Sequence, residues 1–339
     1  MAATIKDIAK MVGVNPSTVS RVINGTASIS DETKNKIREA MEALNYHPNS
    51  NARSLVKGST FTIGLVIDAK NSEAFSNDFF IRSVSAIEAV TQERGFNLLI
   101  CSDRNQNDRN TIETLIFEKK VDGLILPVSV VNCELVSLLK KYNFPFVIMG
   151  IPETLKNDTC WVDMDNALGG ETAVSHLFKQ GYKYPALLVE DENKMFEKNR
   201  IKGYQKAVKD HNPSSDGILF ECNLLRESLT KDIENFLNKN NEIDSFICTN
   251  NDVAFNALRV LKKLNKNVPT DFGIITFDNY PLAKYMDPPL SVIDVDTYKL
   301  GEEAAKMIFT IITESADLPE STLIPTKLIT RESTKRKGE

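Results

Sequence analysis

The sequence predicts an α/β protein with an all-α headpiece at the N-terminus and a body of two doubly wound subdomains, each built on a parallel sheet. Three observations lead to this prediction. The chain has 339 residues, which is too long for one ordinary core. Residues 1–45 contain three segments with helical periodicity. From residue 61 onward, short apolar runs alternate with helical segments, which indicates parallel strands covered on both faces.

Capping residues mark the three helices of the headpiece. The string Thr4-Ile5-Lys6-Asp7 resembles a capping box, and Gly13 can end the helix that follows. Asn15 can cap a second helix, 16–23, whose first residue is a proline. Ser30 can cap a third helix with acidic residues in its first turn. The first two helices are joined by a tight turn, so this order predicts a helix-turn-helix.

The outward face of the second helix carries short polar side chains and one cation, namely Ser17, Thr18, Ser20 and Arg21. Short donors and a forked guanidinium suit base edges and phosphates in a major groove. A plain three-helix bundle is the alternative, but a solvated face would carry more Lys and Glu. We therefore expect this helix to bind DNA.

The net charge of −5 is divided unevenly along the chain. Residues 1–57 hold eight Lys and Arg against five Asp and Glu, a net charge of +3. The remaining residues carry 33 basic and 41 acidic side chains, a net charge of −8. A basic head on an acidic body predicts a phosphate-binding module attached to domains that do not bind nucleic acid.

Several classes of protein find no support in the sequence. No apolar run approaches the length of a membrane span, and the start MAATIKDIAK has no signal-peptide core. We therefore expect a cytoplasmic protein, located with the nucleoid and without a membrane partner. The five cysteines are scattered and form no CxxC pair, which predicts neither a metal site nor a disulfide framework. GxSxG, Walker, HExxH and strand-borne GxGxxG motifs are missing, so we expect no cofactor and no enzymatic activity.

The body, residues 61–339, contains two series of strands and helices. Strands of the first series are expected near 61–68, 97–101, 122–127 and 145–149. The second series is expected to begin at 160–162 and to continue near 184–189, 218–221, 245–249 and 273–277. Two series of similar size predict two subdomains.

Several ordered motifs resemble the lactose- and galactose-repressor family of transcription regulators. They are residues 15–24 (NPSTVSRVIN), 29–33 (ISDET), 44–49 (LNYHPN) and, near the end of the chain, 328–333 (LITRES). The resemblance therefore covers nearly the whole chain. It implies a periplasmic-binding-protein-like body in which segments 291–295 and 323–328 cross between the subdomains.

With this resemblance, the chain divides into a headpiece, a hinge and a body. The headpiece is expected over 1–45 and the hinge over 46–60. The first subdomain is expected over about 61–159 and 290–320, and the second over about 160–289 and 321–333.

The resemblance implies two kinds of DNA contact in the headpiece. Pro16, Ser17 and Arg21 would face bases, with Arg21 as the candidate for a guanine. The phosphate-binding set would be Thr4, Asn15, Thr18, Asn24, Ser30 and Thr33.

The hinge allows two interpretations. It can be a flexible linker, because short isolated helices are marginal in water. The resemblance instead implies a helix that forms only on DNA, where Leu55 wedges a base step in the minor groove. Ala52 would then allow close approach and Arg53 would follow phosphate, and Tyr46 and Asn49 join the DNA-binding set.

A small ligand is expected beyond the carboxyl ends of the strands, between the subdomains. The resemblance implies that Asp278, Arg200 and the pair Asn251-Asp252 bind this effector, with the carboxylate accepting from hydroxyl groups. Asp278 and Asp252 could instead cap a turn or a helix, and Arg200 could form a surface ion pair. Further effector candidates are Phe79 and Phe80 for stacking, Asp68, Asp103 and Arg104 at strand ends, and Trp161, for which core packing is equally compatible.

The strings 75–80 (FSNDFF), 45–49 and 51–55 are most similar to the branch of the family that controls maltose and maltodextrin genes. Aromatic, carboxylate and amide groups suit a neutral polyol better than a purine. The sequence thus predicts a repressor of carbohydrate-utilisation genes that is controlled by a small carbohydrate. A family member that responds to another sugar or to a purine, and a sugar-binding protein without regulation, are the alternatives.

The DNA partner is expected to be a palindromic, double-stranded operator. One headpiece covers only a half-site, so we expect a homodimer. Helix 298–312 can either form the dimer interface or pack inside its own subunit.

Overall fold

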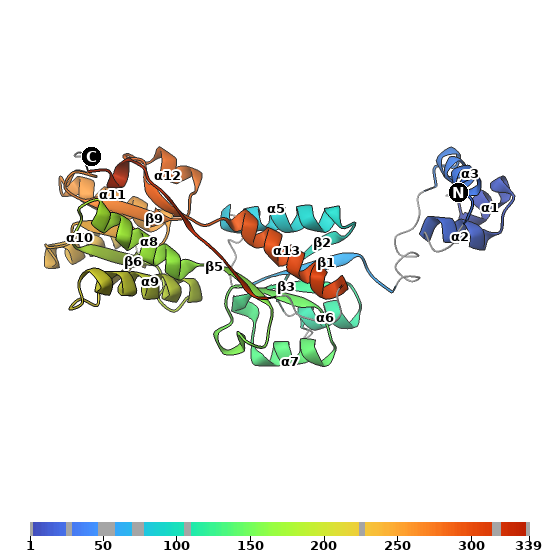
Figure 1. Ribbon diagram of the computed structural model, residues 1–339, viewed down its shortest axis with the longest axis horizontal. Coiled ribbons are helices and arrows are strands. Elements are labelled where there is room, and N and C mark those ends of the chain that lie inside the picture. Colours follow the sequence, from blue (N-terminus) through green and yellow to red (C-terminus); the bar gives the residue numbers. More distant parts are fainter. Residues whose placement is uncertain are drawn as a thin grey trace.

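The computed structural model describes residues 3–24, 29–46, 58–69, 78–104, 110–223, 228–313 and 320–336. The headpiece consists of α1 (Ile5–Val12), α2 (Pro16–Asn24) and α3 (Asp31–Ala43). Its buried residues form a small core of their own, made of Ile8, Ala9, Val19, Ile37 and Ala40. In Figure 1 these three helices stand apart from the body, near the N-terminus.

The expected caps are present in the headpiece. The Asp7 carboxylate accepts from the backbone N–H and the hydroxyl of Thr4, at 2.9 and 2.7 Å. Gly13 ends α1 with a φ of 75°, in the left-handed region that favours glycine. Asn15 accepts from the backbone N–H of Ser17 at 3.3 Å, and Ser30 accepts from that of Thr33 at 3.4 Å. These bonds satisfy amides that a helix start leaves free.

The first sheet of the body has six parallel strands in the order β11-β5-β4-β3-β1-β2. They are β1 (Thr62–Ile67), β2 (Asn97–Ser102), β3 (Gly123–Pro127), β4 (Phe146–Met149), β5 (Trp161–Met164) and β11 (Thr322–Ile324). The helices of this subdomain are α5 (Asp78–Glu93), α6 (Thr111–Phe117), α7 (Cys133–Lys141) and α13 (Thr297–Thr313), with the short turns η2 (Val128–Val130) and η3 (Glu153–Leu155).

The second sheet also has six strands, in the order β12-β10-β9-β8-β6-β7, and only β12 runs antiparallel. They are β6 (Pro185–Val189), β7 (Ile218–Glu221), β8 (Ser245–Cys248), β9 (Gly273–Phe277), β10 (Ser291–Asp294) and β12 (Lys327–Ile329). The accompanying helices are α8 (Asn166–Lys179), α9 (Met195–His211), α10 (Leu229–Lys239), α11 (Asn251–Lys263), α12 (Pro281–Tyr285) and the turn η4 (Glu332–Thr334).

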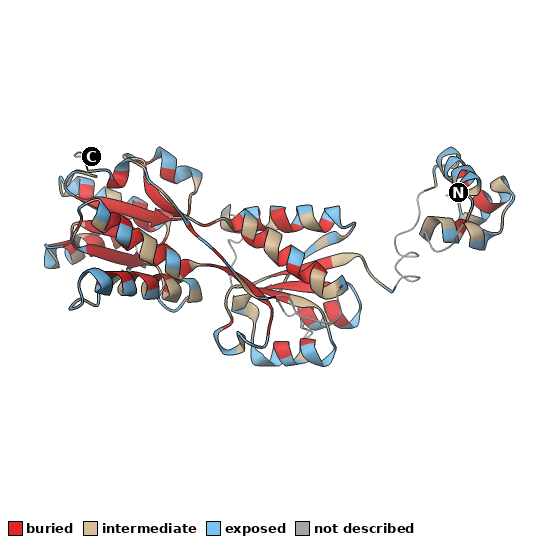
Figure 2. Cartoon of the chain, viewed as in Figure 1, coloured by how far each residue is buried: buried red, intermediate tan, exposed pale blue. Residues whose placement is uncertain are grey.

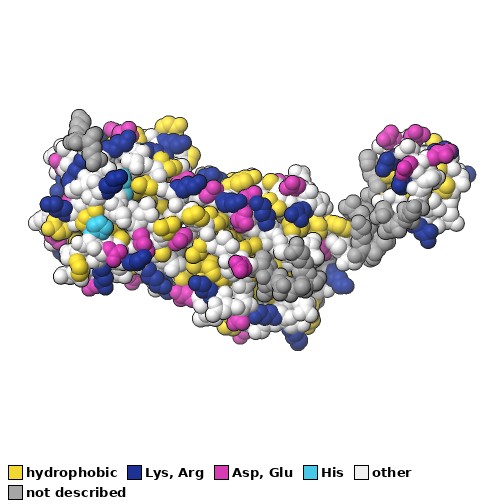
Figure 3. All heavy atoms as spheres, in the orientation of Figure 1, with side chains coloured by type: hydrophobic (Ala, Val, Ile, Leu, Met, Phe, Trp, Pro, Cys, Tyr) yellow, Lys and Arg dark blue, Asp and Glu magenta, His cyan; other side chains and the backbone are white. Residues whose placement is uncertain are grey.

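Buried residues follow the strands of both subdomains in Figure 2. This burial explains why the strands are continuous apolar runs in the sequence. The strands β6, β8 and β9 are buried along their whole length, because helices cover both faces. The helices themselves bury one face each. On the face of the body seen in Figure 3, positive and negative side chains are interspersed over both subdomains.

Two glycines allow helices to approach closely. A Cβ on Gly203 in α9 would lie 1.9 Å from the carbonyl oxygen of Ala167 in α8. A Cβ on Gly301 in α13 would lie 2.2 Å from the carbonyl oxygen of Ser83 in α5. Each subdomain therefore has one helix pair whose spacing requires glycine.

The expected boundaries of the subdomains are wrong at three strands. We expected 160–162 to open the second series, but β5 pairs with β4 and β11 in the first sheet. We expected 290–320 in the first subdomain and 321–333 in the second, but β10 belongs to the second sheet and β11 to the first. An apolar pattern predicts a buried strand and carries no information on which of two similar sheets it joins.

The chain consequently passes between the sheets three times. The crossings lie between β5 and α8, between β10 and α13, and between β11 and β12. The long strand-like segments that link the two halves of the body are visible in Figure 1. Helix α13 contacts α5 and the strands β3, β4 and β5 of the first sheet.

Candidate functional site

Three predicted effector residues meet at the carboxyl ends of the second sheet. Arg200 comes from α9, Asn251 begins α11 after β8, and Asp278 follows β9. All three are buried, with exposed fractions of 4%, 4% and 8%. Strand ends β8 and β9 are neighbours in the sheet, which places the two loops side by side. We call Arg200, Asn251 and Asp278 the Arg200 cluster.

The guanidinium of Arg200 is held in one orientation from several sides. Its Nε donates to Asn166 Oδ1 at 3.0 Å, and its Nη1 donates to the carbonyl oxygen of Thr249 at 2.6 Å. Its central carbon lies 4.0 Å from the ring centre of Phe277. The remaining nitrogen, Nη2, lies 3.9 Å from Asp278 Oδ1, longer than a hydrogen bond. The plane of the guanidinium is therefore fixed, and its Nη2 faces Asp278 without a hydrogen bond to it.

Asp278 has a strained backbone, and one oxygen of its carboxylate accepts no hydrogen bond from the described residues. Its φ is +69°, which a non-glycine residue rarely adopts, and such backbone strain often accompanies binding sites. Burial raises the pKa of its carboxyl, Arg200 opposes this shift, and the charge of Asp294 adds to it. Among the described residues, Oδ1 of Asp278 has no hydrogen-bond partner.

Asn251 fixes the loop that carries Asp278. Its amide nitrogen donates to the carbonyl oxygens of Phe277 and Asp278, at 3.2 and 2.9 Å. Within the described part of the chain, its Oδ1 is also a buried oxygen without a hydrogen-bond donor. The cluster thus presents two acceptor oxygens and one oriented guanidinium, which together suit a ligand with hydroxyl groups.

The sequence prediction missed four residues around Arg200, namely Asp163, Asn166, Glu197 and Thr249. Asp163 ends up buried near the first crossing, where it accepts from the backbone N–H of Ile151 at 3.2 Å and of Met164 at 2.7 Å. Burial raises the pKa of Asp163 to about 6, although these two bonds and Arg200 lower it. It lies within a strand, so no strand-end signal marked it.

Glu197 is fully buried one turn before Arg200 on α9. Burial raises the pKa of its carboxyl, while Arg200 and the Thr249 hydroxyl lower it. Residues three apart share a helix face, and this spacing could have identified Glu197 as a neighbour of Arg200.

Two predicted effector residues have other surroundings. Trp161 is buried in β5 of the first sheet, and its indole N–H donates to the carbonyl oxygen of Lys156 at 3.0 Å. Its side chain is therefore packed inside the first subdomain. Asp252 is exposed. The helix cap, which was its alternative role, is supplied by Asn250, which accepts from the backbone N–H of Val253 at 2.8 Å.

The remaining effector candidates lie at the carboxyl edge of the first sheet. Asp68 follows β1, and Asp103 follows β2 and accepts from the backbone N–H of Ala69 at 2.6 Å. Arg104 is exposed, and its carbonyl oxygen accepts from the hydroxyl of Thr111. Phe79 and Phe80, in the first turn of α5, are half-buried and pack against the main core.

In the headpiece, the predicted base-facing residues are accessible. Pro16, Ser17 and Arg21 are exposed, and Thr18 and Ser20 are half-buried on the same helix. Ser17 donates its hydroxyl hydrogen to Asn15 at 3.2 Å, so Asn15 acts as a cap as well as a phosphate candidate.

The predicted phosphate contacts Thr4 and Ser30 are exposed, and Thr33 is half-buried. Tyr46 packs against the headpiece core. The side chain of Asn24 and the residues Asn49, Ala52, Arg53 and Leu55 lie outside the described part of the chain.

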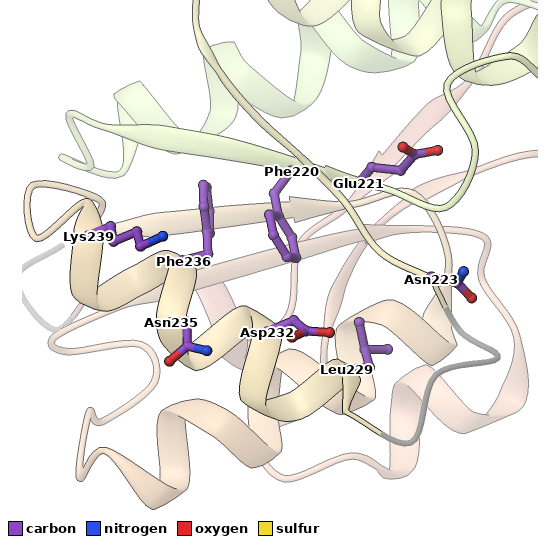
Figure 4. Close-up of a pocket in the computed structure, with 8 residues that line it drawn as sticks. All are labelled: Phe220, Glu221, Asn223, Leu229, Asp232, Asn235, Phe236 and Lys239. Atoms are coloured by element: carbon purple, nitrogen blue, oxygen red, sulfur yellow. The ribbon is translucent and has the colours of Figure 1, made fainter.

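One hollow lies elsewhere, at the outer edge of the second sheet between β7 and α10. Figure 4 shows its lining residues Phe220, Glu221, Asn223, Leu229, Asp232, Asn235, Phe236 and Lys239. The rings of Phe220 and Phe236 are stacked with centroids 4.5 Å apart. The hollow contains no member of the Arg200 cluster. Among described residues, no helix could span a membrane and no group of His, Cys, Asp and Glu could hold a metal ion.

Comparison with known proteins agrees with both parts of this architecture. Residues 4–49 match the family described as bacterial regulatory proteins, lacI family, and residues 174–334 match the periplasmic binding protein-like domain. The HTH-type transcriptional regulator MalR of Streptococcus pneumoniae serotype 4 is 33% identical over 93% of this chain and 94% of its own.

Two solved structures are similar over most of the chain. A transcriptional regulator CelR–cellobiose complex covers 98% of this chain and 99% of its own, with 25% identity and a TM-score of 0.71. A probable maltose operon transcriptional repressor malR from Staphylococcus aureus covers 82% and 99%, with 25% identity and a TM-score of 0.70. The helix-turn-helix, the two-subdomain body and these relatives together show that the chain is a transcriptional regulator, not an enzyme, and that it belongs to the lacI family of bacterial regulatory proteins.

Proposed function

We propose that the protein is a homodimeric repressor of carbohydrate-utilisation genes, which binds a palindromic operator and is controlled by a small neutral sugar. Maltose or a short maltodextrin is the first candidate. The observation that carries the proposal is the Arg200 cluster, where two buried acceptor oxygens have no donor among the described residues and lie beside an oriented guanidinium. Sugar hydroxyls can donate to such oxygens and accept from the guanidinium.

The charges around the site favour a neutral ligand. Asp163, Glu197 and Asp278 are buried near Arg200, the one cation that acts on all three within the described part of the chain, and burial raises the pKa of each carboxyl. An anionic ligand would add a further negative charge to this environment, which costs free energy. A polyol adds none.

Maltose is supported by relatives rather than by the site itself. A 33% identical relative is named MalR, and a solved structure at 25% identity is that of a probable maltose operon transcriptional repressor. The regulator solved with cellobiose indicates that this architecture also accepts another glucose disaccharide. We therefore place disaccharides first and extend the test to other sugars and to purines.

The DNA-binding set is proposed as it was predicted, with Pro16, Ser17 and Arg21 toward bases. The exposure of these residues supports it. The hinge residues Ala52, Arg53 and Leu55 are proposed as minor-groove contacts on the resemblance alone. The protein would act in the cytoplasm, on DNA of the nucleoid.

Dimerisation through the apolar face of α13 is not supported, because Leu300, Ala304, Met307 and Ile308 are buried against their own sheet. We propose a different apolar face on the second subdomain. Leu282 and Tyr285 lie one turn apart on α12 and are 48% and 82% exposed. Two exposed apolar side chains on the same helix face form a contiguous apolar surface, and such surfaces occur at protein interfaces.

The deciding experiment is fluorescence anisotropy on a labelled palindromic operator of the family type, with and without maltose, at one fixed salt concentration. Salt must be fixed because phosphate contacts make DNA affinity steeply dependent on ionic strength. Loss of tight operator binding on addition of maltose supports the proposal.

Operator binding that maltose does not change overturns the maltose assignment, and a panel of mono- and disaccharides and purines then identifies the effector class. Absence of preference for operator over random DNA overturns the regulatory proposal.

A further inference from the structure

The C-terminal motif at residues 331–334 packs against the loops of the second sheet. Arg331 donates from Nη2 to Asn279 Oδ1 at 2.5 Å and from Nη1 to the carbonyl oxygen of Leu290 at 2.7 Å. Its backbone N–H donates to the Ser291 hydroxyl oxygen at 2.8 Å. The side chain therefore joins the loop after β9 to the residue that precedes β10.

The partner of Arg331 is the direct neighbour of Asp278. Asp278 adopts the strained φ of +69° and faces Arg200, while the next side chain, Asn279, is held by Arg331. A strained residue persists only where its surroundings determine its conformation. Asn251 fixes the carbonyl of Asp278 from one side, and Arg331 fixes Asn279 from the other.

Arg331 also contacts the segments that cross between the subdomains. It follows β12, which the chain reaches through the third crossing, and its partners Leu290 and Ser291 lead into β10, which ends at the second crossing. The backbone N–H of Asp278 donates to Ile293 of the same strand at 3.1 Å. The loop that carries Asp278 is thus tied to two of the three crossings.

The fork of Arg331 is not needed to anchor the C-terminus, because its neighbours already do so. The Ser333 hydroxyl donates to the carbonyl oxygen of Ile274 at 2.6 Å and accepts from the backbone N–H of Ser291 at 2.8 Å. Thr334 bonds the buried His176 side chain at 2.8 Å. These groups contact the sheet and α8, whereas the Arg331 side chain contacts the loop 278–279 that follows β9.

We propose that Arg331 is a positioning residue, which holds the loop 278–279 in its binding conformation and links effector binding at Asp278 to the crossing segments. The proposal rests on the proposed function, since it assumes that Asp278 binds the effector. It predicts that loss of the guanidinium fork weakens effector binding and its transmission to the operator, while the fold persists.

The test uses the full-length protein and the variants Arg331→Met, Arg331→Lys, Asn279→Ala and the double variant Arg331→Met with Asn279→Ala. Arg336→Met is the matched control. Arg336 lies in the same C-terminal segment and donates to the carbonyl oxygen of Gly181 at 2.7 Å, away from the loop at 278. Three quantities are measured: the thermal midpoint, amide hydrogen exchange of the peptide that spans 278–285, and maltose affinity by calorimetry.

We expect Arg331→Met to speed exchange in that peptide and to weaken maltose binding about tenfold, the typical effect of a lost charged hydrogen bond. Asn279→Ala should cause a similar loss, and the double variant should lose no more than either single variant, because both remove one interaction. Arg331→Lys keeps the charge but loses the fork, so it should also speed exchange. Arg336→Met should leave exchange and maltose affinity at wild-type values.

Wild-type exchange and wild-type maltose affinity in Arg331→Met and Asn279→Ala would overturn the proposal. Losses of the same size in Arg336→Met, at an equal fall of the thermal midpoint, would overturn it too. If Arg331→Met does not fold, Asn279→Ala decides alone, since it truncates only the partner amide. If wild type responds to no sugar, the effector assignment fails separately, and hydrogen exchange still decides whether Arg331 positions the loop.

Discussion

Among the described residues, three buried carboxyl groups surround one cation, Arg200. Asp163, Glu197 and Asp278 all have raised pKa values, and burial is the main cause in each case. Such an arrangement costs stability, because removing one charge from water is compensated only by good pairing and hydrogen bonds. It is consistent with a binding site at which a ligand supplies the missing donors.

Asp278→Asn should weaken sugar binding without unfolding the protein. Asparagine keeps the shape but replaces one acceptor oxygen by a donor group, so a sugar hydroxyl loses a charged acceptor. We expect a loss of about 1.5–3 kcal/mol in binding free energy, measured by calorimetry. Operator affinity without sugar should stay at the wild-type value.

The matched control for this variant is Asp252→Asn, at a residue that the sequence also placed in the site. The structure shows that side chain exposed, next to Asn250, which caps the helix. We expect unchanged sugar affinity. Equal losses in Asp252→Asn and Asp278→Asn would contradict the assignment of Asp278 as the main acceptor.

Asp163 should make stability fall as pH rises through the weakly acidic range. The unfolded chain releases this proton near the ordinary pKa of 3.8, while the folded chain releases it near 6. The folded state therefore binds the proton more tightly, and its contribution is complete below pH 3.8 and lost as pH rises to about 6. The difference amounts to about 3 kcal/mol, on the order of 1.4 kcal/mol for each unit of pKa shift.

The measurement compares urea unfolding of wild type and Asp163→Asn between pH 4 and pH 7, followed by fluorescence of Trp161, the single tryptophan. Asparagine cannot titrate, although it loses one of the two acceptor bonds to the backbone of Ile151 and Met164. The wild-type curve should fall relative to the variant as pH rises. Parallel curves would show that Asp163 does not titrate in this window.

Arg21→Ala should reduce operator preference more than general DNA affinity. A bidentate contact to guanine contributes about 1–3 kcal/mol of discrimination, whereas a phosphate contact contributes equally to every sequence. We expect the ratio of operator to random-DNA affinity, measured by anisotropy at fixed salt, to fall about tenfold or more. Equal losses on both DNAs would reassign Arg21 to a phosphate.

Single residues were predictable where a motif or a strand end marked them. Arg200, Asn251 and Asp278 follow family motifs and meet as expected. Asp163 has no such mark, since it lies within an apolar strand and its role depends on where the chain leaves the first sheet. Trp161 was uncertain for a physical reason, because an aromatic side chain suits both a sugar face and a core.

At the scale of elements, the kind of each segment was easier to predict than its partner. Periodicity and caps indicated α1, α2 and α3, and apolar runs indicated the strands. The same runs could not assign β5, β10 and β11 to a sheet, because both sheets bury their strands in the same way. The crossings follow from that pairing, so the position of Asp163 beside Arg200 could not be predicted either.

The close contact between helices α8 and α9 allows a prediction about stability. These helices carry Asn166 and Arg200, whose side chains are bonded at 3.0 Å. Gly203→Ala would place a methyl group 1.9 Å from the carbonyl oxygen of Ala167, which neither backbone can accommodate without moving. The helix-propensity gain of about 1 kcal/mol from replacing glycine cannot offset this overlap.

We expect Gly203→Ala to lower the free energy of unfolding by about 1–3 kcal/mol, the usual cost of overpacking, and to weaken sugar binding by separating Asn166 from Arg200. Lys202→Ala, at an exposed neighbour on α9, is the control. A more stable Gly203→Ala protein with normal sugar affinity would show that the two helices can separate freely.

At the scale of the whole molecule, effector and operator must act on each other through a shared equilibrium. A sugar changes DNA affinity only if it binds two states of the body with different affinity, and the operator then changes sugar affinity by the same factor. Three crossings connect the subdomains, and the Arg200 cluster lies near the first and second of them. The backbone segments at these crossings are therefore a direct route by which a signal can pass from this cluster to the first subdomain.

The signal reaches a palindromic operator only if two headpieces are joined. Leu282→Asp with Tyr285→Asp places two charges on the exposed face of α12 and should prevent self-association, because a buried unpaired charge is costly in an interface. Sedimentation should show a monomer with an unchanged circular dichroism spectrum.

Operator affinity of this double variant should fall toward that of a single half-site, while maltose affinity stays at the wild-type value, since α12 carries no member of the Arg200 cluster. The control is Phe117→Asp, which places a charge on an exposed aromatic residue of the first subdomain. A variant that remains dimeric with both charges in place would move the interface to another face. Ile81 and Tyr298 of the first subdomain, which are also exposed, would then be the next candidates.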